Sequence, residues 1–128
     1  MDRNELNALS NKIIGAAIEV HRLLGPGLLE NTYRDALMYE LELLGIKAQK
    51  EVSVPLIYKG RLIGNAYRAD IIVEDLIILE LKSTENDNPV YYKQLLTYLR
   101  LADKRLGFVI NFHYKYLSQG ITRIVNKF

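Results

Sequence analysis

The segment that most constrains the fold is a short apolar run in the second half of the chain. Residues 76 to 83 read Leu-Ile-Ile-Leu-Glu-Leu-Lys-Ser, so Glu80 and Lys82 are the charged interruptions. A strand that is apolar on both faces is typical of the centre of a sheet whose two sides are covered. Glu80 and Lys82 are two residues apart, so they point to the same face of this strand. The run therefore predicts a covered central strand that carries charged side chains.

The flanking segments predict helices on either side of a group of strands. Helices are expected over residues 3 to 24, 28 to 44 and 90 to 103, and strands over 51 to 58, 61 to 74, 76 to 83, 106 to 112 and 121 to 125. Pro55 indicates a sheet edge or a bulge in the first strand. Neither a repeat nor a linker divides the chain. We therefore expect an α/β fold, with a central mixed sheet of about four to five strands flanked by helices, as one domain over residues 1–128.

Composition excludes several classes of site and partner. The 128 residues are 49% hydrophobic and 25% charged, as in an ordinary globular protein. The net charge of +2 permits a polyanionic partner without demonstrating one. The absence of cysteine excludes disulfides, thiolate metal sites and a cysteine nucleophile. We see no signal peptide and no apolar run of about 20 residues, so we expect a cytoplasmic protein without a membrane partner.

A second carboxylate is expected next to Glu80. Asp70 lies in the segment Ala-Tyr-Arg-Ala-Asp-Ile-Ile-Val, which precedes the central strand. Charged side chains are rare in apolar strands unless they are paired or bind a metal. Asp70 and Glu80, with the carbonyl of Leu81, would form a hard-oxygen site for Mg²⁺ or Mn²⁺. The alternative is that Asp70 pairs with Arg68, and Glu80 with Lys82.

Two further side chains extend this hypothesis. Lys82 would orient an attacking water or stabilise the charge that develops on a phosphate during hydrolysis. Glu30 lies three residues before Tyr33, on the expected inward stripe of the second helix, and would add a carboxylate directly or through water. The alternatives are that Lys82 only neutralises Glu80, and that Glu30 is a first-turn residue favoured by the helix dipole.

Several motifs together resemble a known family. The stretch Gly-Leu-Leu-Glu-Asn-Thr-Tyr, residues 27 to 33, looks like the signature of the small bacterial GxxExxY proteins. These are placed in the PD-(D/E)xK nuclease superfamily, nearest its RecB-type branch. Asp70 and Glu80-Leu81-Lys82 fall where that superfamily keeps its metal-binding acids and lysine. One departure is Ala69, which stands where the superfamily motif has proline.

The resemblance implies a nuclease-like fold and a metal-dependent nuclease. Its substrate would be a nucleic acid, DNA rather than RNA, and its cofactor Mg²⁺ or Mn²⁺. Gln94 and Tyr98 match the Gln-x-x-x-Tyr motif of the RecB-type branch, and His21 lies where some relatives carry a histidine. A solvated Gln94, packed Tyr33 and Tyr98 side chains, and a structural His21 are the alternatives. The site implied by the resemblance comprises Glu30, Asp70, Glu80, Leu81, Lys82, Gln94 and Tyr98, with Tyr33 and His21 as further candidates.

Two other functions stay open at this point. One is a non-catalytic module that binds nucleic acid or another protein on a nuclease-like fold. The other is a structural α/β domain whose acids are ion-paired. A small domain offers little surface for sequence-specific recognition, so a homodimer or a protein partner is also an open expectation.

Overall fold

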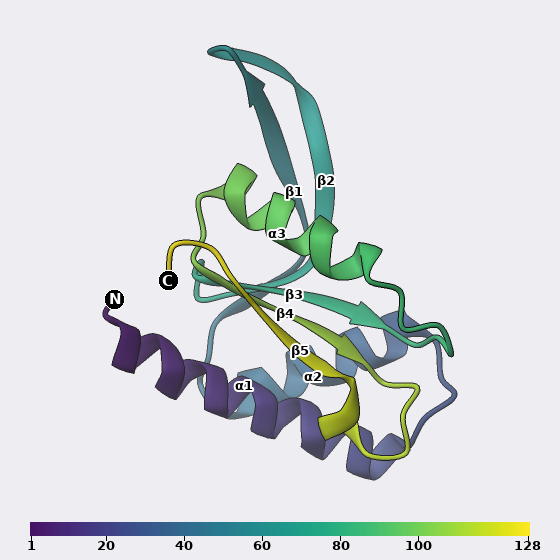
Figure 1. Cartoon of the computed structure of the whole chain (residues 1–128). Helices are drawn as coiled ribbons and strands as arrows, with labels where there is room; N and C mark the ends of the chain where they lie inside the picture. The colour runs from purple at the N-terminus through teal and green to yellow at the C-terminus, as the bar shows by residue number, and fades with distance from the viewer.

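The computed structural model describes all 128 residues apart from the side chain of Ala66. The predicted α/β class is confirmed: three α-helices flank a five-stranded mixed sheet in the described chain (Figure 1). The elements are α1 (Arg3–Leu24), α2 (Glu30–Leu43), β1 (Ala48–Tyr58), β2 (Arg61–Val73), β3 (Ile77–Lys82), α3 (Val90–Ala102), β4 (Leu106–Asn111), the 3-10 helix η1 (Leu117–Gly120) and β5 (Ile121–Val125).

The strands follow the order β1-β2-β3-β4-β5, so β3 is central as expected. The pairs β1–β2, β2–β3 and β4–β5 are antiparallel, whereas β3 and β4 are parallel. A parallel pair needs a crossover, and α3 provides it. Pro55 lies in the edge strand β1 next to a register shift, as its sequence position indicated.

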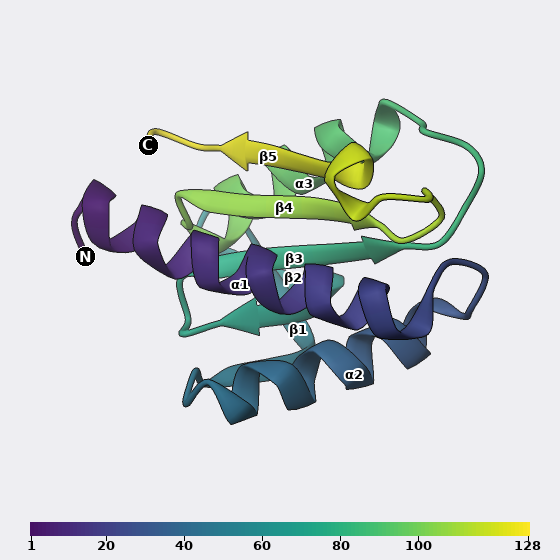
Figure 2. The same cartoon turned by 90° about the horizontal axis from the view of Figure 1, so that it is seen from below.

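The helices cover the two faces of the sheet (Figure 2). Ile77, Leu79 and Leu81 pack into the cluster shared with α1 and α2, whereas Ile78 packs into the cluster beneath α3. This alternation follows from the two-residue period of a strand. It also assigns Glu80 and Lys82, which share the parity of Ile78, to the side of the sheet that α3 covers.

The start of α2 differs from the prediction. The helix begins at Glu30 rather than near residue 28. Gly27 adopts a φ of +99°, which favours glycine, and Leu29 is extended at φ −72° and ψ 152°. The chain therefore becomes helical two residues later than the apolar pattern suggested, and Glu30 is the first residue of the helix.

The β1–β2 hairpin projects beyond the rest of the sheet (Figure 1). It leaves the sheet near Glu51, whose φ of +54° interrupts the ladder between the pairs Lys50–Ile71 and Val52–Ala69. Positive φ is uncommon for a residue with a Cβ, so this bend needs support from its neighbours. The bend places Asp70, on the partner strand, at the base of the hairpin.

Candidate metal centre

Asp70 and Glu80 lie at the point where β2 and β3 separate. The last pair of their ladder joins Ile71 to Leu79, and the same register places Asp70 opposite Glu80. The backbone N–H of Leu81 donates to Asp70 Oδ2 over 2.7 Å. The Asp70 carboxylate is therefore fixed against the backbone between Glu80 and Lys82.

Glu80 is half-buried, and one of its carboxylate oxygens is fully buried and unsatisfied. Its Oε1 is inaccessible to water and has no hydrogen-bond partner among the residues that the structure describes. Burial, and secondarily the negative charge of Asp70, raises the pKa of Glu80 to about 8, although Lys82 opposes this shift. A pair of close carboxylates with an unpaired oxygen is the arrangement that a bound cation would stabilise.

The alternative to a metal site was that Asp70 pairs with Arg68 and Glu80 with Lys82. Neither ion pair is formed among the side chains that the structure describes. Arg68 approaches Glu51 at 3.8 Å rather than Asp70. Lys82 places its Nζ 4.6 Å from the centroid of the Tyr91 ring, a cation–π contact that leaves the ammonium outside any salt bridge with Glu80. The two acids are therefore not neutralised by these basic neighbours.

A small pocket lies between Asp70 and α2. The pocket has a volume of about 160 Å³ and is lined by Glu30, Asn31, Arg34, Asp70 and Leu81. Glu30 is exposed, which corrects the expectation that it lies on the inward stripe with Tyr33. Helix side chains tilt toward the N-terminus, so the side chain of the first residue extends past the packed part of the helix. Glu30 therefore borders the pocket rather than the core.

Tyr33 holds the loop that precedes Glu30. Its ring is fully buried and stacks on Phe112 at 4.2 Å between centroids. Its hydroxyl donates to the carbonyl of Gly25 and accepts from the N–H of Leu28 over 3.1 Å. The Ser83 hydroxyl donates to the carbonyl of Leu28 over 2.7 Å, which ties the same loop to the end of β3. Tyr33 thus contacts the backbone of the loop and not the pocket.

His21 lies apart from the acids. Its Nε2 is 2.7 Å from the carbonyl oxygen of Tyr114, and because a carbonyl only accepts, this nitrogen carries the proton. The imidazole is buried and lines a pocket with Gly25 and Tyr116, not the pocket of Glu30 and Asp70. The structure thus places His21 as a link between α1 and the loop after β4.

The two α3 candidates differ in their surroundings. Tyr98 is half-buried and stacks on Tyr67 at 3.6 Å between ring centroids. Burial, and secondarily the charge of Glu80, raises the pKa of Tyr98. Gln94 is exposed one turn earlier and makes none of the side-chain hydrogen bonds described for the chain.

Sequence reasoning missed three residues around this site. Arg34 lines the pocket, and its guanidinium contacts Glu51 at 2.7 Å, which supports the bend beside Asp70. Buried Asn111 donates to the carbonyl of Thr84 and accepts from its N–H, so it fixes the exit of β3. Tyr67 has a buried hydroxyl without a partner.

Two of the three missed residues carried a signal in the sequence. Arg34 lies one helical turn after Glu30, and Asn111 is the polar end of an apolar strand; both signals could have been noticed. The aromatic ring of Tyr67 had no such marker, because its role depends on which residue of α3 packs above it.

The donor set fits a divalent cation with few protein ligands. Within the described residues, no group of three or more His, Cys, Asp or Glu side chains is placed to hold a metal. Mg²⁺ usually keeps several waters and takes one or two carboxylates from the protein. Asp70, Glu80 with its unpaired Oε1, and the Leu81 carbonyl meet that requirement, and Glu30 lines the same pocket as Asp70 and Leu81.

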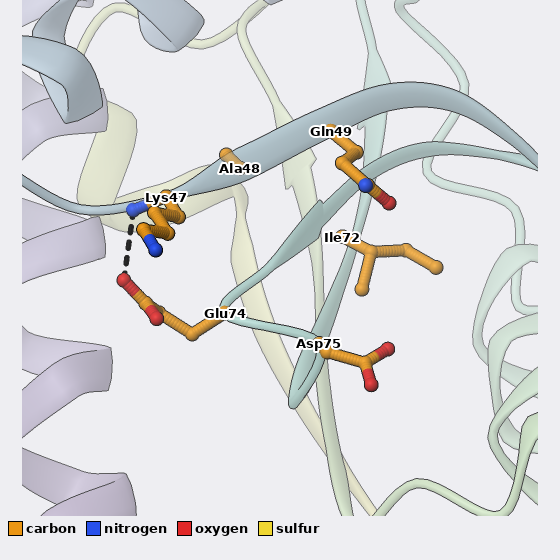
Figure 3. A pocket seen from close by; sticks show the side chains of 6 residues that line it. All are labelled: Lys47, Ala48, Gln49, Ile72, Glu74 and Asp75. Carbon is orange, nitrogen blue, oxygen red and sulfur yellow. Dashed lines mark hydrogen bonds between the residues drawn. The ribbon is translucent and has the colours of Figure 1, made fainter.

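A larger cavity than the pocket beside Asp70 lies elsewhere (Figure 3). It has a volume of about 640 Å³ and surrounds the β2–β3 turn, at the opposite end of β3 from Leu81. Its acids are already bonded: Glu74 accepts from the N–H of Lys47 over 2.8 Å, and Asp75 pairs with Lys104 at 3.0 Å. This cavity is therefore not a candidate for the chemistry of Asp70 and Glu80.

Comparison with known proteins gives one result. A sequence model described as the PD-(D/E)XK nuclease superfamily matches residues 7–124. No curated protein and no solved structure matches the chain. In the part of the chain that the structure describes, no helix combines the length and apolar character needed to span a membrane.

Proposed function

Because the chain belongs to the PD-(D/E)XK nuclease superfamily, we propose that it is a metal-dependent nuclease that hydrolyses phosphodiester bonds in DNA. The observation that carries this proposal is the Asp70–Glu80 pair at the separation of β2 and β3. These carboxylates lack the expected ion-pair partners, and Glu80 Oε1 is buried without a hydrogen bond. Superfamily membership supports a nucleic acid substrate and a divalent ion, and Mg²⁺ or Mn²⁺ suits the oxygen donors.

The protein ligands in this proposal are Asp70, Glu80 and the carbonyl of Leu81, with Glu30 bound through water. A divalent ion held there would supply charge to polarise the phosphate and to acidify a water. The Leu81 N–H keeps one Asp70 oxygen oriented, so the other oxygen is the one left for the cation. Glu30, at the pocket edge, would accept a hydrogen bond from water at the site.

Lys82 would act on the substrate side of the acids. It shares the strand face of Glu80, and its ammonium is held over the ring of Tyr91 rather than in a salt bridge. An ammonium in that position can orient the attacking water or stabilise negative charge on the phosphate in the transition state. Gln94 and Tyr98 would support the substrate or Lys82 from the neighbouring face of α3.

The finer family assignment is also part of this proposal. Residues 27 to 33 act as a unit, because the Tyr33 hydroxyl bonds both Gly25 and Leu28 and so orients the start of α2 at Glu30. This unit supports membership in the GxxExxY proteins, and the effect of the Glu80 charge on the pKa of Tyr98 supports the RecB-type branch. We also propose that residues 1–128 form one nuclease-like domain that works in the cytoplasm.

Cleavage assays test the proposal. Plasmid and single-stranded DNA would be incubated with the protein and Mg²⁺ or Mn²⁺, with EDTA as the blank. We expect cleavage by the wild type and none by Asp70→Asn. Asparagine keeps an oxygen that can accept from the Leu81 N–H, so the fold should survive while the charge is lost. Equal cleavage by both proteins would refute the site, and DNA binding without any cleavage would favour a non-catalytic binding module.

A further inference from the structure

The β1–β2 hairpin ends in a tip that is exposed on all sides. Residues 57 to 65, called the tip below, are all exposed, and they project past α3 (Figure 1). Four large apolar side chains lie there with more than half of their surface open: Ile57, Tyr58, Leu62 and Ile63. Exposed apolar side chains that form a contiguous patch mark an interaction surface, and Ile57 and Leu62 are paired across the ribbon.

The outer part of the hairpin, between Glu51 and Asp70, carries charge of one sign. From residue 52 to residue 69 the sequence contains Lys59, Arg61 and Arg68 and neither aspartate nor glutamate. Lys59 and Arg61 flank Gly60 at the turn itself. Because the whole chain carries a net charge of only +2, this segment is a local concentration of positive charge suited to a polyanion.

The two faces of the tip differ. Ile57 pairs with Leu62 across the ribbon, and Tyr58 pairs with Arg61. Adjacent residues of a strand point to opposite faces, so Ile57 and Leu62 share one face and Tyr58 and Arg61 share the other. Lys59 strengthens the second face, since its Nζ lies 5.5 Å from the centroid of the Tyr58 ring.

A single strand joins the tip to the candidate metal centre. Val52, nearer the base of β1, packs into the cluster beneath α3, the side of the sheet to which Glu80 and Lys82 are assigned. The strand β2 then runs from Arg61 directly to Asp70. At about 3.3 Å per residue this separation is about 25 to 30 Å, close to one turn of duplex DNA at about 34 Å.

We propose that the tip is a DNA-binding arm that enters a groove of duplex DNA about one helical turn from the phosphate held at Asp70 and Glu80. The proposal rests on the nuclease function proposed above and specifies its substrate as a duplex. The major groove of B-DNA admits a two-stranded ribbon, whereas that of an RNA duplex is too narrow to be read. Lys59 and Arg61 contact phosphates, and Ile57 and Leu62 contact base edges.

A second copy of the chain is the competing occupant of the tip. Pairing two tips would bring Lys59 and Arg61 of each copy together, and no acid within residues 52 to 69 offsets them. The phosphates of DNA neutralise the same charges and release counterions on binding. Charge complementarity therefore favours DNA.

Binding measured by fluorescence anisotropy in EDTA tests the arm, since cleavage is then absent. The probes are duplexes of about 30 and about 6 base pairs, the shorter of which cannot reach from the site to the tip. The double variant Lys59→Ala/Arg61→Ala is compared with Lys12→Ala/Lys127→Ala, which removes the same charge from exposed positions outside the hairpin.

We expect the tip variant to bind the long duplex about tenfold more weakly. The slope of log affinity against log salt concentration should be smaller in magnitude by about 2, one unit for each lost phosphate contact. The control variant should match the wild type, and the short duplex should not distinguish the three proteins. Equal affinity and slope for the tip variant and the wild type would overturn the arm. A wild-type dimer that Ile57→Ser/Leu62→Ser dissociates, with DNA affinity unchanged, would also overturn it.

The experiments distinguish a wrong proposal for the arm from a wrong proposal for the nuclease function. Cleavage by the wild type with tip-independent binding would refute only the arm. Tip-dependent binding without cleavage in Mg²⁺ or Mn²⁺ would refute the nuclease function and leave the tip as a DNA-binding element.

Discussion

At the scale of single residues, the burial of Glu80 disfavours the charged form of its carboxylate. Its pKa rises from an ordinary value of 4.5 to about 8 because the carboxylate is buried beside Asp70. Between these two pH values the folded protein binds a proton that the unfolded chain has released. The free energy of unfolding therefore falls as the pH rises from 4.5 to about 8. Above that range this loss of stability is complete.

Glu80→Gln should abolish this pH dependence. Thermal unfolding in EDTA should show the wild type losing stability from pH 4.5 to 8, and the variant should lose less and be the more stable protein at the alkaline end. Glutamine retains the shape of the side chain without the charge, which isolates the electrostatic effect. Identical pH profiles for both proteins would mean that Glu80 is ionised in the fold without penalty.

Lys82→Ala should separate chemistry from metal binding. The ammonium lies over Tyr91 and outside the salt bridges described, so its removal should leave the affinity for the divalent ion nearly intact. Losing one preorganised charge near the reacting phosphate lowers turnover by about 100- to 1,000-fold. Kinetics at saturating metal would test this, and normal turnover with a lost metal site would contradict the role.

At the scale of elements, the loop before α2 is held by a few contacts that act on Glu30. Tyr33→Phe keeps the stacking on Phe112 but removes the hydroxyl that bonds Gly25 and Leu28. We expect a loss of about 1 kcal/mol in stability. Turnover should fall further than stability explains, because Glu30 is no longer fixed.

Tyr39→Phe is the matched control on the same helix, since Tyr39 is 59% exposed. Denaturant unfolding and cleavage rates of both variants would be compared with the wild type. If Tyr33→Phe behaved like Tyr39→Phe, the loop would not depend on the hydroxyl.

Most elements could be predicted because their patterns are local. The helix over residues 3 to 24 and the turn at Lys59-Gly60 lie where the periodicity and turn signals placed them. The start of α2 could not be placed, since the extended conformation of Leu29 depends on the Tyr33 and Ser83 contacts. The ladder between β2 and β3 brings Asp70 and Glu80 together as their order along the chain suggested.

Other features of the site depend on tertiary contacts that no local pattern encodes. His21 bonds a carbonyl 93 residues away, so its position apart from the acids could not be read from α1 alone. The bend at Glu51 is supported by Arg34 from another element. The exposure of Glu30 follows from where α2 begins rather than from its three-residue spacing from Tyr33.

At the scale of the whole molecule, the protein consists of a packed body and the projecting β1–β2 hairpin (Figure 1). Asp70 lies where the two meet, so one strand connects the proposed metal site to the proposed DNA-binding tip. If a duplex contacts both, removing Lys59 and Arg61 should reduce cleavage of long duplexes more than of short ones. Cleavage rates over a series of duplex lengths would show this, and equal effects at every length would contradict it.

The central claim is that Asp70 and Glu80 form a divalent-metal site. Its most direct test is calorimetric titration of Mg²⁺ and Mn²⁺ into the wild type, Asp70→Asn and Glu80→Gln. We predict binding to the wild type that either substitution abolishes, in proteins whose thermal unfolding remains cooperative. Binding that persists unchanged in both variants would place the metal elsewhere, and no binding to the wild type at millimolar metal would contradict the site.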